Sequence, residues 1–429
     1  MNQTERISSE KRHVLIQGGR VAAPDGRLIR ADVLIDAAGL IAEVAPGIVP
    51  PAQAALVDAS DSLVVPGFVD CHQHLDKTGV LRFAPNPSGT LQGAREAFAT
   101  YARQAPPEDI FRRASKTIGR CMAHGTTAIR SHVNVDKDAG FNGIEALAQL
   151  RADWADRMAL QLVAFMTPHP GQDLDWLAAN IDRAAASADA VGGTPAVAED
   201  PDRYLDLIFQ AAADRGLPVD LHMDEHLDPT RLHFDKVFER VRRFGMQGRT
   251  VLGHTSVLSA LPSAQFQRIM AEILELEIGL VTLPAANLYL QGRDAEQLPP
   301  RGLTRVAQLL RAGVPLATAS DNIEDPFVPT GSGDMLEMAR WTLLAGHLKG
   351  DELAATYDMI TAIPARLMGL DGYGIEKGNP ANLNVMQADD IDTLVAGGPV
   401  AASVFAKGRL VCRSAQSEIP LAAGSLQPC

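Results

Sequence analysis

Eight short apolar runs occupy residues 63 to 320 of this 429-residue chain, and stretches with helical spacing of apolar residues separate most of them. The runs cover residues 63–69, 126–133, 159–166, 188–192, 218–223, 250–254, 278–283 and 315–320. Nearly continuous apolar character is typical of strands that are buried on both faces of a parallel sheet. Helical spacing is clearest at 202–215 and 303–312. Eight strands with helical crossovers over about 255 residues predict an α/β fold of the TIM-like (β/α)8 barrel type rather than an open sheet.

Polar side chains gather where four of these runs end, at the first, fifth, sixth and eighth. The four groups are His72-Gln73-His74, His222-Met223-Asp224-Glu225, His254, and Ser320-Asp321-Asn322. They are far apart in the sequence, so only a closed fold can bring them together. In a barrel, the carboxyl ends of the strands carry the catalytic residues.

Strand geometry suggests which of these side chains bind a metal ion and which transfer protons. His72 and His74 are two positions apart, so both imidazoles point to the same face of a strand. His222 and Asp321 can complete a set of three histidines and one carboxylate, which suits zinc or ferrous iron. Such a set leaves a position for water, whose pKa the metal lowers to roughly 7.

Glu225 follows His222 by three positions, so a regular strand would turn the two side chains to opposite faces. We therefore expect Glu225 just past the strand end, where a partly buried carboxylate moves protons rather than binding metal. Each group also has a simpler interpretation, because an isolated His254 is often a packed core residue and Asp321-Asn322 resembles a turn or a helix cap. Their joint occurrence at four strand ends favours a site.

The two ends of the chain have a different texture. Short apolar runs separated by Gly- and Asp-containing turns fill residues 13–65 and return near 381–406. This pattern is typical of short strands without helices between them. We predict a small β-sandwich module formed by both termini, residues 1–65 and 371–429, around a barrel at 66–370.

Composition limits the possible partners and the compartment. The net charge of −13 argues against binding to a nucleic acid backbone, which requires a basic face. No apolar run is long enough to span a membrane, and the first twelve residues lack the apolar segment of a secretion signal. The four cysteines show no paired spacing, as expected for reduced thiols. We expect a cytoplasmic protein without a membrane partner.

Several motifs resemble one family over nearly the whole chain. Residues 65–76, VPGFVDCHQHLD, resemble the opening motif of the amidohydrolase superfamily. Residues 221–225, 253–255, 287–293 and 301–305 look closest to the cytosine deaminase group. Residues 319–323, 328–329 and 333–335 look more like N-isopropylammelide amidohydrolase, a triazine-degrading relative. The split β module around a barrel is also typical of this superfamily.

The resemblance implies a role for each polar residue. It makes one zinc or iron ion the cofactor, with four ligands: His72, His74, His222 and Asp321. It implies that Glu225 protonates a ring nitrogen and later assists departure of the amine, and that His254 orients the water and stabilises the developing oxyanion. Asp321 would also accept the proton of the water. No lysine stands at the end of the third or fourth predicted strand, which favours a single metal ion.

The sequence departs from these relatives where they bind substrate. Thr167 stands where they carry a glutamine that holds the edge of the ring, and a hydroxyl cannot offer the donor and acceptor pair of a carboxamide. Asn322 replaces a second aspartate, and Phe327 replaces a tryptophan. Gln291 is a further candidate for the pocket, and Lys77 is either a contact for an anionic substrate or a solvated lysine at the rim. The departures argue against cytosine and favour a bulkier or less polar ring.

Three hypotheses follow. The first is a metal-dependent deaminase that attacks a ring C–N carbon of a small nitrogen heterocycle and releases ammonia. The second is an amidohydrolase that cleaves an N-alkylamino-triazine or a cyclic amide. The third is a scaffold or binding protein that kept the barrel without catalysis, against which the intact set of polar residues argues. Acidic barrels of this family often form oligomers, so the resemblance makes a homo-oligomer an expectation.

Overall fold

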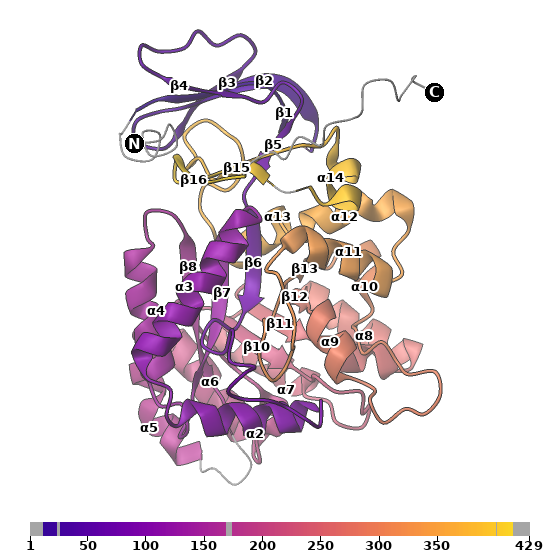
Figure 1. Cartoon of the computed structure of the whole chain (residues 1–429). Helices are drawn as coiled ribbons and strands as arrows, with labels where there is room; N and C mark the ends of the chain where they lie inside the picture. Colours follow the sequence, from indigo (N-terminus) through magenta and orange to yellow (C-terminus); the bar gives the residue numbers. More distant parts are fainter. Residues whose placement is uncertain (1–11, 24–25, 169–173, 400, 415–429) are drawn as a thin grey trace.

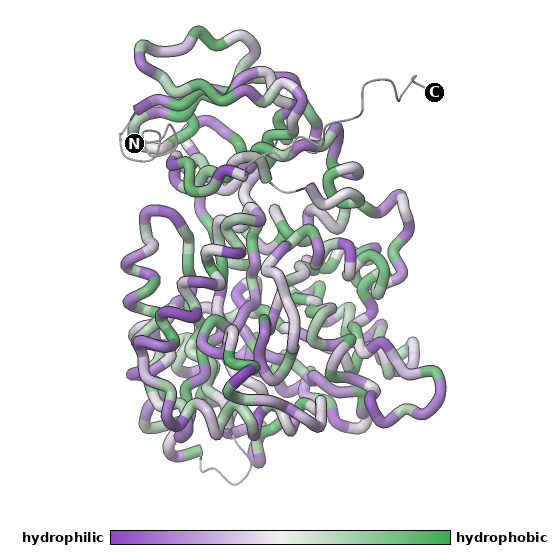
Figure 2. The backbone as a smooth tube through the Cα atoms, in the orientation of Figure 1, coloured by the Kyte–Doolittle hydropathy of each residue, from purple (hydrophilic) through white to green (hydrophobic). Residues whose placement is uncertain are grey.

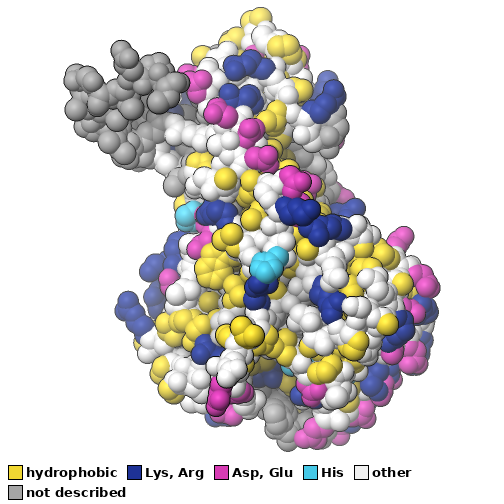
Figure 3. All heavy atoms as spheres, turned by 90° about the vertical axis from the view of Figure 1, so that its right-hand side faces the viewer, with side chains coloured by type: hydrophobic (Ala, Val, Ile, Leu, Met, Phe, Trp, Pro, Cys, Tyr) yellow, Lys and Arg dark blue, Asp and Glu magenta, His cyan; other side chains and the backbone are white. Residues whose placement is uncertain are grey.

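The computed structural model describes residues 12–23, 26–168, 174–399 and 401–414. Two lobes make up the molecule, a larger one containing a parallel barrel and a smaller one containing a separate sheet (Figures 1 and 3). The ends of the predicted β module, residues 1–11 and 415–429, lie outside the described residues.

Eight parallel strands of the described chain form the barrel, and each one pairs with the next along the sequence. They are β6 (Phe68–Gln73), β7 (Thr126–Val135), β8 (Ala159–Met166), β9 (Ala190–Gly193), β10 (Val219–Met223), β11 (Thr250–His254), β12 (Gly279–Thr282) and β13 (Leu316–Thr318). The predicted barrel of the TIM type is confirmed. Its strands are buried along almost their whole length because helices cover the outside of the barrel.

Thirteen α-helices are assigned in the described residues. They are α2 (Leu91–Ala102), α3 (Pro107–Ala123), α4 (Asn142–Asp153), α5 (Leu174–Ala185), α6 (Pro201–Arg215), α7 (Phe234–Phe244), α8 (Ser263–Glu275), α9 (Pro284–Leu290), α10 (Val306–Arg311), α11 (Met335–Ala345), α12 (Leu353–Asp358), α13 (Ala362–Leu367) and α14 (Ile391–Gly397). The predicted helices at 202–215 and 303–312 correspond to α6 and α10. None of the helices within the described ranges is both long and apolar enough to cross a bilayer.

Strands from both ends of the chain form the second sheet. They are β1 (Val14–Ala22), β2 (Leu28–Ile35), β3 (Ile41–Ala45), β4 (Ala55–Asp58), β5 (Leu63–Pro66), β14 (Leu383–Met386), β15 (Ala401–Ala406) and β16 (Arg409–Arg413). The two halves meet where β14 pairs antiparallel with β5. The tube in Figure 2 is largely hydrophobic along these strands, and they enclose a core of their own. The prediction of a β module built from both termini is confirmed.

One expectation about the barrel was wrong in detail. The apolar run 63–69 is two strands, because β5 belongs to the terminal sheet and only β6 enters the barrel. Gly67 lies at the break, and a Cβ atom there would come within 2.2 Å of the Thr127 hydroxyl oxygen. A residue without a side chain is therefore required where the chain passes from one sheet to the other.

The seam between β13 and β6 closes the barrel without a regular ladder. An isolated parallel bridge joins Gln73 to Asp321, whose backbone N–H donates to the carbonyl oxygen of His72 at 2.9 Å. Next to it, the Asp70 carboxylate accepts hydrogen bonds from both the backbone N–H and the hydroxyl of Ser320. Side-chain contacts thus complete the barrel beside the polar residues singled out in the sequence.

Candidate active site

Three histidines and one aspartate converge at the carboxyl ends of the barrel strands. His72 is on β6, His74 follows it, His222 is on β10, and Asp321 follows β13. Nε2 of His222 lies 3.0 Å from Nε2 of His74 and 3.2 Å from Nε2 of His72. Nε2 of His74 lies 3.2 Å from a carboxylate oxygen of Asp321. All four side chains are buried, so the fold joins residues that lie up to 249 positions apart.

The chemistry of these atoms fits a bound cation. Burial lowers the pKa of His72, His74 and His222 well below the usual range, so the imidazoles are neutral and offer lone pairs. Three ring nitrogens that face one another at this distance cannot all be satisfied by hydrogen bonds among themselves. Both carboxylate oxygens of Asp321 are buried without a hydrogen-bond partner within the described residues. One cation between these atoms would satisfy all of them.

The backbone is strained where three of the strands end. Asp224, His254 and Asp321 have φ angles of 43°, 63° and 61°, in the left-handed region that residues with a Cβ atom avoid. Each costs roughly 1 kcal/mol. Such strain persists where the surrounding structure fixes it, typically at functional sites. Here the strained residues lie at the carboxyl ends of the strands, beside the polar side chains of the candidate site.

His254 and Glu225 lie beside this group. Nδ1 of His254 is 3.1 Å from the amide nitrogen of Asn287 and 3.6 Å from a carboxyl oxygen of Glu225. Because the Asn287 amide group donates to Nδ1, the proton of the neutral ring sits on Nε2, which lies 4.0 Å from Asp321. A protonated Nε2 cannot bind a metal. The Nε2–H group of His254 therefore points towards Asp321 from beyond hydrogen-bond distance, although the position of the ring alone would also allow it to be a ligand.

Burial shifts the pKa values of these two side chains in opposite directions. It raises the pKa of Glu225 to about 8, with the nearby Asp321 acting in the same sense. It lowers the pKa of His254 to about 4. At neutral pH the carboxyl group is therefore mostly protonated and the imidazole is neutral. A protonated carboxyl group beside a neutral histidine is a pairing suited to acid–base catalysis.

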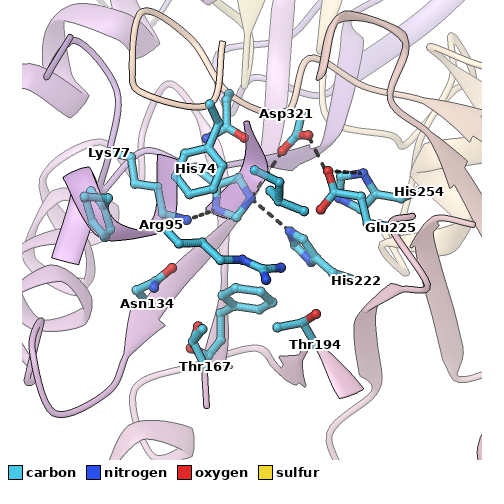
Figure 4. A pocket seen from close by; sticks show the side chains of 15 residues that line it. His74, Lys77, Arg95, Asn134, Thr167, Thr194, His222, Glu225, His254 and Asp321 are labelled. Carbon is cyan, nitrogen blue, oxygen red and sulfur yellow. Dashed lines mark hydrogen bonds and ion pairs between the residues drawn. The ribbon is translucent and has the colours of Figure 1, made fainter. Parts of the chain in front are cut away.

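A pocket opens over the site (Figure 4). Fifteen residues line it: His74, Lys77, Leu91, Arg95, Phe98, Asn134, Phe165, Thr167, Thr194, His222, Glu225, His254, Asp321, Asn322 and Phe327. Among the expected substrate contacts, Thr167, Asn322, Phe327 and Lys77 line it. Gln291 does not, because its amide group donates at 3.1 Å to the backbone carbonyl oxygen of Glu225.

Lys77 is buried, with an exposed fraction of 3%, which argues against the solvated alternative. Its ammonium nitrogen lies 2.9 Å from Nδ1 of His74. The same nitrogen lies 5.2 to 5.7 Å from the ring centroids of Phe98, Phe165 and Phe327. Aromatic faces at this distance attract a cation. Lys77 thus brings a positive charge to the wall of the cavity.

A buried group of polar side chains, His132, Asp220 and Arg130, packs beside His72. The ring of His132 lies 3.9 Å, centroid to centroid, from the ring of His72. Nε2 of His132 is 3.1 Å from one oxygen of Asp220, and the other oxygen accepts from Arg130 at 2.9 Å. Tight packing against the ring of His132 limits the movement of the His72 imidazole.

Buried neutral imidazoles and a carboxylate at the carboxyl ends of the strands of a (β/α)8 barrel fit a metal-dependent enzyme. A sequence profile of the amidohydrolase family matches residues 55–145 and 112–397. A pterin deaminase of Rhizobium rhizogenes is 32% identical over 90% of this chain and 89% of its own. The N-isopropylammelide isopropyl amidohydrolase of Pseudomonas sp. strain ADP is 29% identical over 83% of this chain and 88% of its own.

A solved structure is similar as well. The 5-methylcytosine deaminase of Klebsiella pneumoniae, liganded with 5-fluorocytosine, superposes with a TM-score of 0.86 at 28% identity, covering 95% of this chain and 99% of that one. The chain belongs to the amidohydrolase family, and it is an enzyme that hydrolyses carbon–nitrogen bonds other than peptide bonds.

Proposed function

We propose that this enzyme is a metal-dependent deaminase that removes an exocyclic amino group from a small nitrogen heterocycle as ammonia. His72, His74, His222 and Asp321 would hold one zinc or iron ion. When bound, the ion would supply Lewis-acid activation of the attacking water. The convergence of three neutral imidazoles and an unpartnered carboxylate within one buried cluster carries this proposal.

The protein's own groups suit the proton transfers of a deamination. Glu225, protonated near neutral pH, would donate its proton to a ring nitrogen next to the carbon under attack. That proton makes the ring carbon more electrophilic. Glu225 would then regain the proton that Asp321 takes from the attacking water and pass it to the leaving nitrogen, which releases the amine. The hydroxyl proton on the attacked carbon would restore the carboxyl group of Glu225 as the product carbonyl forms. Asp321 would accept a proton from the attacking water. His254 would donate its Nε2–H to the developing oxyanion.

The relatives support a heterocyclic substrate. Two of the similar proteins are named as deaminases, of pterin and of 5-methylcytosine. Thr167 and Asn322 line the cavity here, and their side chains differ from those expected for a cytosine site. A pterin-sized ring is therefore favoured over cytosine.

A second candidate is cleavage of an N-alkyl substituent, with an alkylamine as product. The relative that acts on N-isopropylammelide and the apolar side chains of Leu91, Phe98 and Phe327 at the cavity favour it. The same site would catalyse either reaction, because only the substituent on the leaving nitrogen differs.

The test is metal analysis of the purified protein followed by assays on pyrimidines, triazines, pterins and cyclic ureides. We expect about one ion per chain and ammonia release from at least one amino-substituted ring. The His74→Ala variant should lose both the metal and the activity, whereas His124→Ala, which does not line the cavity, should keep both. Alkylamine without ammonia would select the second candidate. A metal-free wild-type protein, or no hydrolysis of any ring, would contradict both.

A further inference from the structure

Helix α2 forms one wall of the cavity. The helix lies across the end of the barrel opposite to the terminal sheet (Figure 1). Leu91, Arg95 and Phe98 stand on one face of α2, at helical spacing, and all three line the cavity. The hydroxyl of Thr90 caps the helix by accepting from the backbone N–H of Gly93 at 3.1 Å.

The start of α2 is also tied to the opposite wall of the cavity. The amide group of Asn86 donates both to the carbonyl oxygen of Thr90, at 2.9 Å, and to that of Pro326, at 3.0 Å. Pro326 directly precedes Phe327, which lines the cavity on that side. The position of Arg95 over the site is therefore fixed by the fold rather than by an independent surface helix.

The guanidinium group of Arg95 reaches into the cavity towards His222 (Figure 4). The side chain is half-buried, and within the described part of the chain it has neither a hydrogen bond nor an ion pair. Burial lowers the pKa of the Arg95 guanidinium group, and the electrostatic attraction of Glu225 acts in the opposite sense without a direct contact. An arginine partly removed from water without an anion is unfavourable, so a partner is expected.

Lys77 brings a second positive charge to the same cavity. Nδ1 of His74 lies 2.9 Å from the Lys77 ammonium and 3.0 Å from the carbonyl oxygen of His132. One nitrogen cannot donate to the carbonyl oxygen and accept from the ammonium at the same time. In the tautomer that leaves Nε2 free, Nδ1 carries the proton and donates to His132, so the Lys77 ammonium loses this acceptor. Arg95 and Lys77 then both face the cavity without a hydrogen-bonded anion among the described residues.

We infer that Arg95 binds a carboxylate carried by the heterocyclic substrate, with Lys77 adding to the positive potential. The inference rests on the proposed function, and it adds that the natural substrate class is an anionic, carboxylate-bearing ring. Arginine suits this role because its planar fork pairs with a carboxylate through two parallel hydrogen bonds. The hydroxyls of Thr167 and Thr194, which line the same cavity, remain for the neutral edge of the ring.

The alternative is that Arg95 acts only through its field on Glu225. The positive charge lowers the pKa of that carboxyl group, against the larger effect of burial. Loss of such a field would change the rate for every substrate alike. Loss of a carboxylate contact would affect only substrates that carry the carboxylate, so matched substrate pairs separate the two roles.

The experiment compares kcat/KM for two substrates that share one ring and differ only in whether it carries a carboxylate or a carboxamide substituent. One such pair is built on cytosine and one on pterin, and both are assayed with the metal-loaded enzyme. We expect the wild type to prefer the carboxylate, and Arg95→Met to reduce that preference by about 30-fold, the value of a charge-assisted contact. Arg95→Lys should keep part of the preference because it retains the charge without the fork. The control is Arg103→Met at the end of the same helix, where the side chain is exposed and paired with Asp138.

Three results would overturn the inference. One is equal wild-type rates on both members of each pair. Another is an equal loss on both members in Arg95→Met, which would assign Arg95 to the field on Glu225 or to the helix. If no ring is hydrolysed, the proposed function fails instead, and calorimetric binding of the two carboxylates still tests Arg95. In that case the inference fails if Arg95→Met, with its metal content unchanged, binds them as tightly as the wild type.

Discussion

Replacing Glu225 by glutamine should stabilise the protein while removing most of its activity. The carboxyl group of Glu225 is buried, and one of its oxygens lies 3.6 Å from Nδ1 of His254. Burial raises its pKa from 4.5 to about 8. A glutamine has nearly the same shape but cannot ionise, so it removes the cost of burying a group that prefers to be charged.

The size of the effect follows from the pKa shift. Between pH 4.5 and 8 the folded protein holds a proton that the unfolded chain has lost. The free energy of unfolding therefore falls as the pH rises, by about 1.4 kcal/mol for each pH unit. From pH 5 to pH 7, the wild type should lose about 2.5 kcal/mol relative to Glu225→Gln. The catalytic rate should fall by about 100-fold because the proton donor is gone.

Urea unfolding of the metal-free proteins at several pH values between 5 and 7 measures this difference. Comparing the trend with pH removes any constant effect of the amide group itself. The exposed Glu296, changed to glutamine, is the matched control. A difference between wild type and Glu225→Gln that stays constant over this range would refute the reasoning, because the carboxyl group would then not be held protonated by burial.

Three other perturbations have clear expected outcomes. The buried Tyr204 hydroxyl connects the ends of β8 and β9, because it donates to the Met166 carbonyl oxygen and accepts from the Thr194 N–H at 3.0 Å. Tyr204→Phe should lower the free energy of unfolding in urea by about 2 kcal/mol. The same variant should raise KM more than it lowers kcat. Thr167→Gln should gain cytosine deamination relative to the wild type in an ammonia-release assay, since a carboxamide offers the missing donor and acceptor pair. Chelation of the metal should abolish hydrolysis and lower the thermal midpoint in calorimetry, with zinc or ferrous iron restoring both.

The barrel and its polar residues could be predicted because their signals are local. Strands buried on both faces are short apolar runs, and the histidines and Asp321 stand directly at the ends of such runs. The boundary between β5 and β6 could not be located as readily, since both strands are buried and the apolar run does not stop between them. Gly67 was the available signal, but a glycine inside an apolar run does not say which sheet each half joins.

The residues that shape the cavity depend on tertiary contacts. Arg95 lies on an amphipathic helix whose sequence does not show which end of the barrel it covers. The burial of Lys77 depends on Phe98, Phe165 and Phe327, which come from three separate segments. Lys77 therefore remained undecided between the rim and the cavity until these segments were placed in space.

The irregular seam between β13 and β6 has a consequence for how the molecule matures. Its contacts join residues about 250 positions apart, such as Asp70 and Ser320, so loop-closure entropy makes this seam a late event in folding. Asp321 arrives beside His72 and His74 only when the seam closes. A nascent or partly refolded chain would therefore lack the complete set of four proposed metal ligands. We expect metal binding and barrel closure to occur together. The rate of metal uptake during refolding would therefore report the rate of this last folding step.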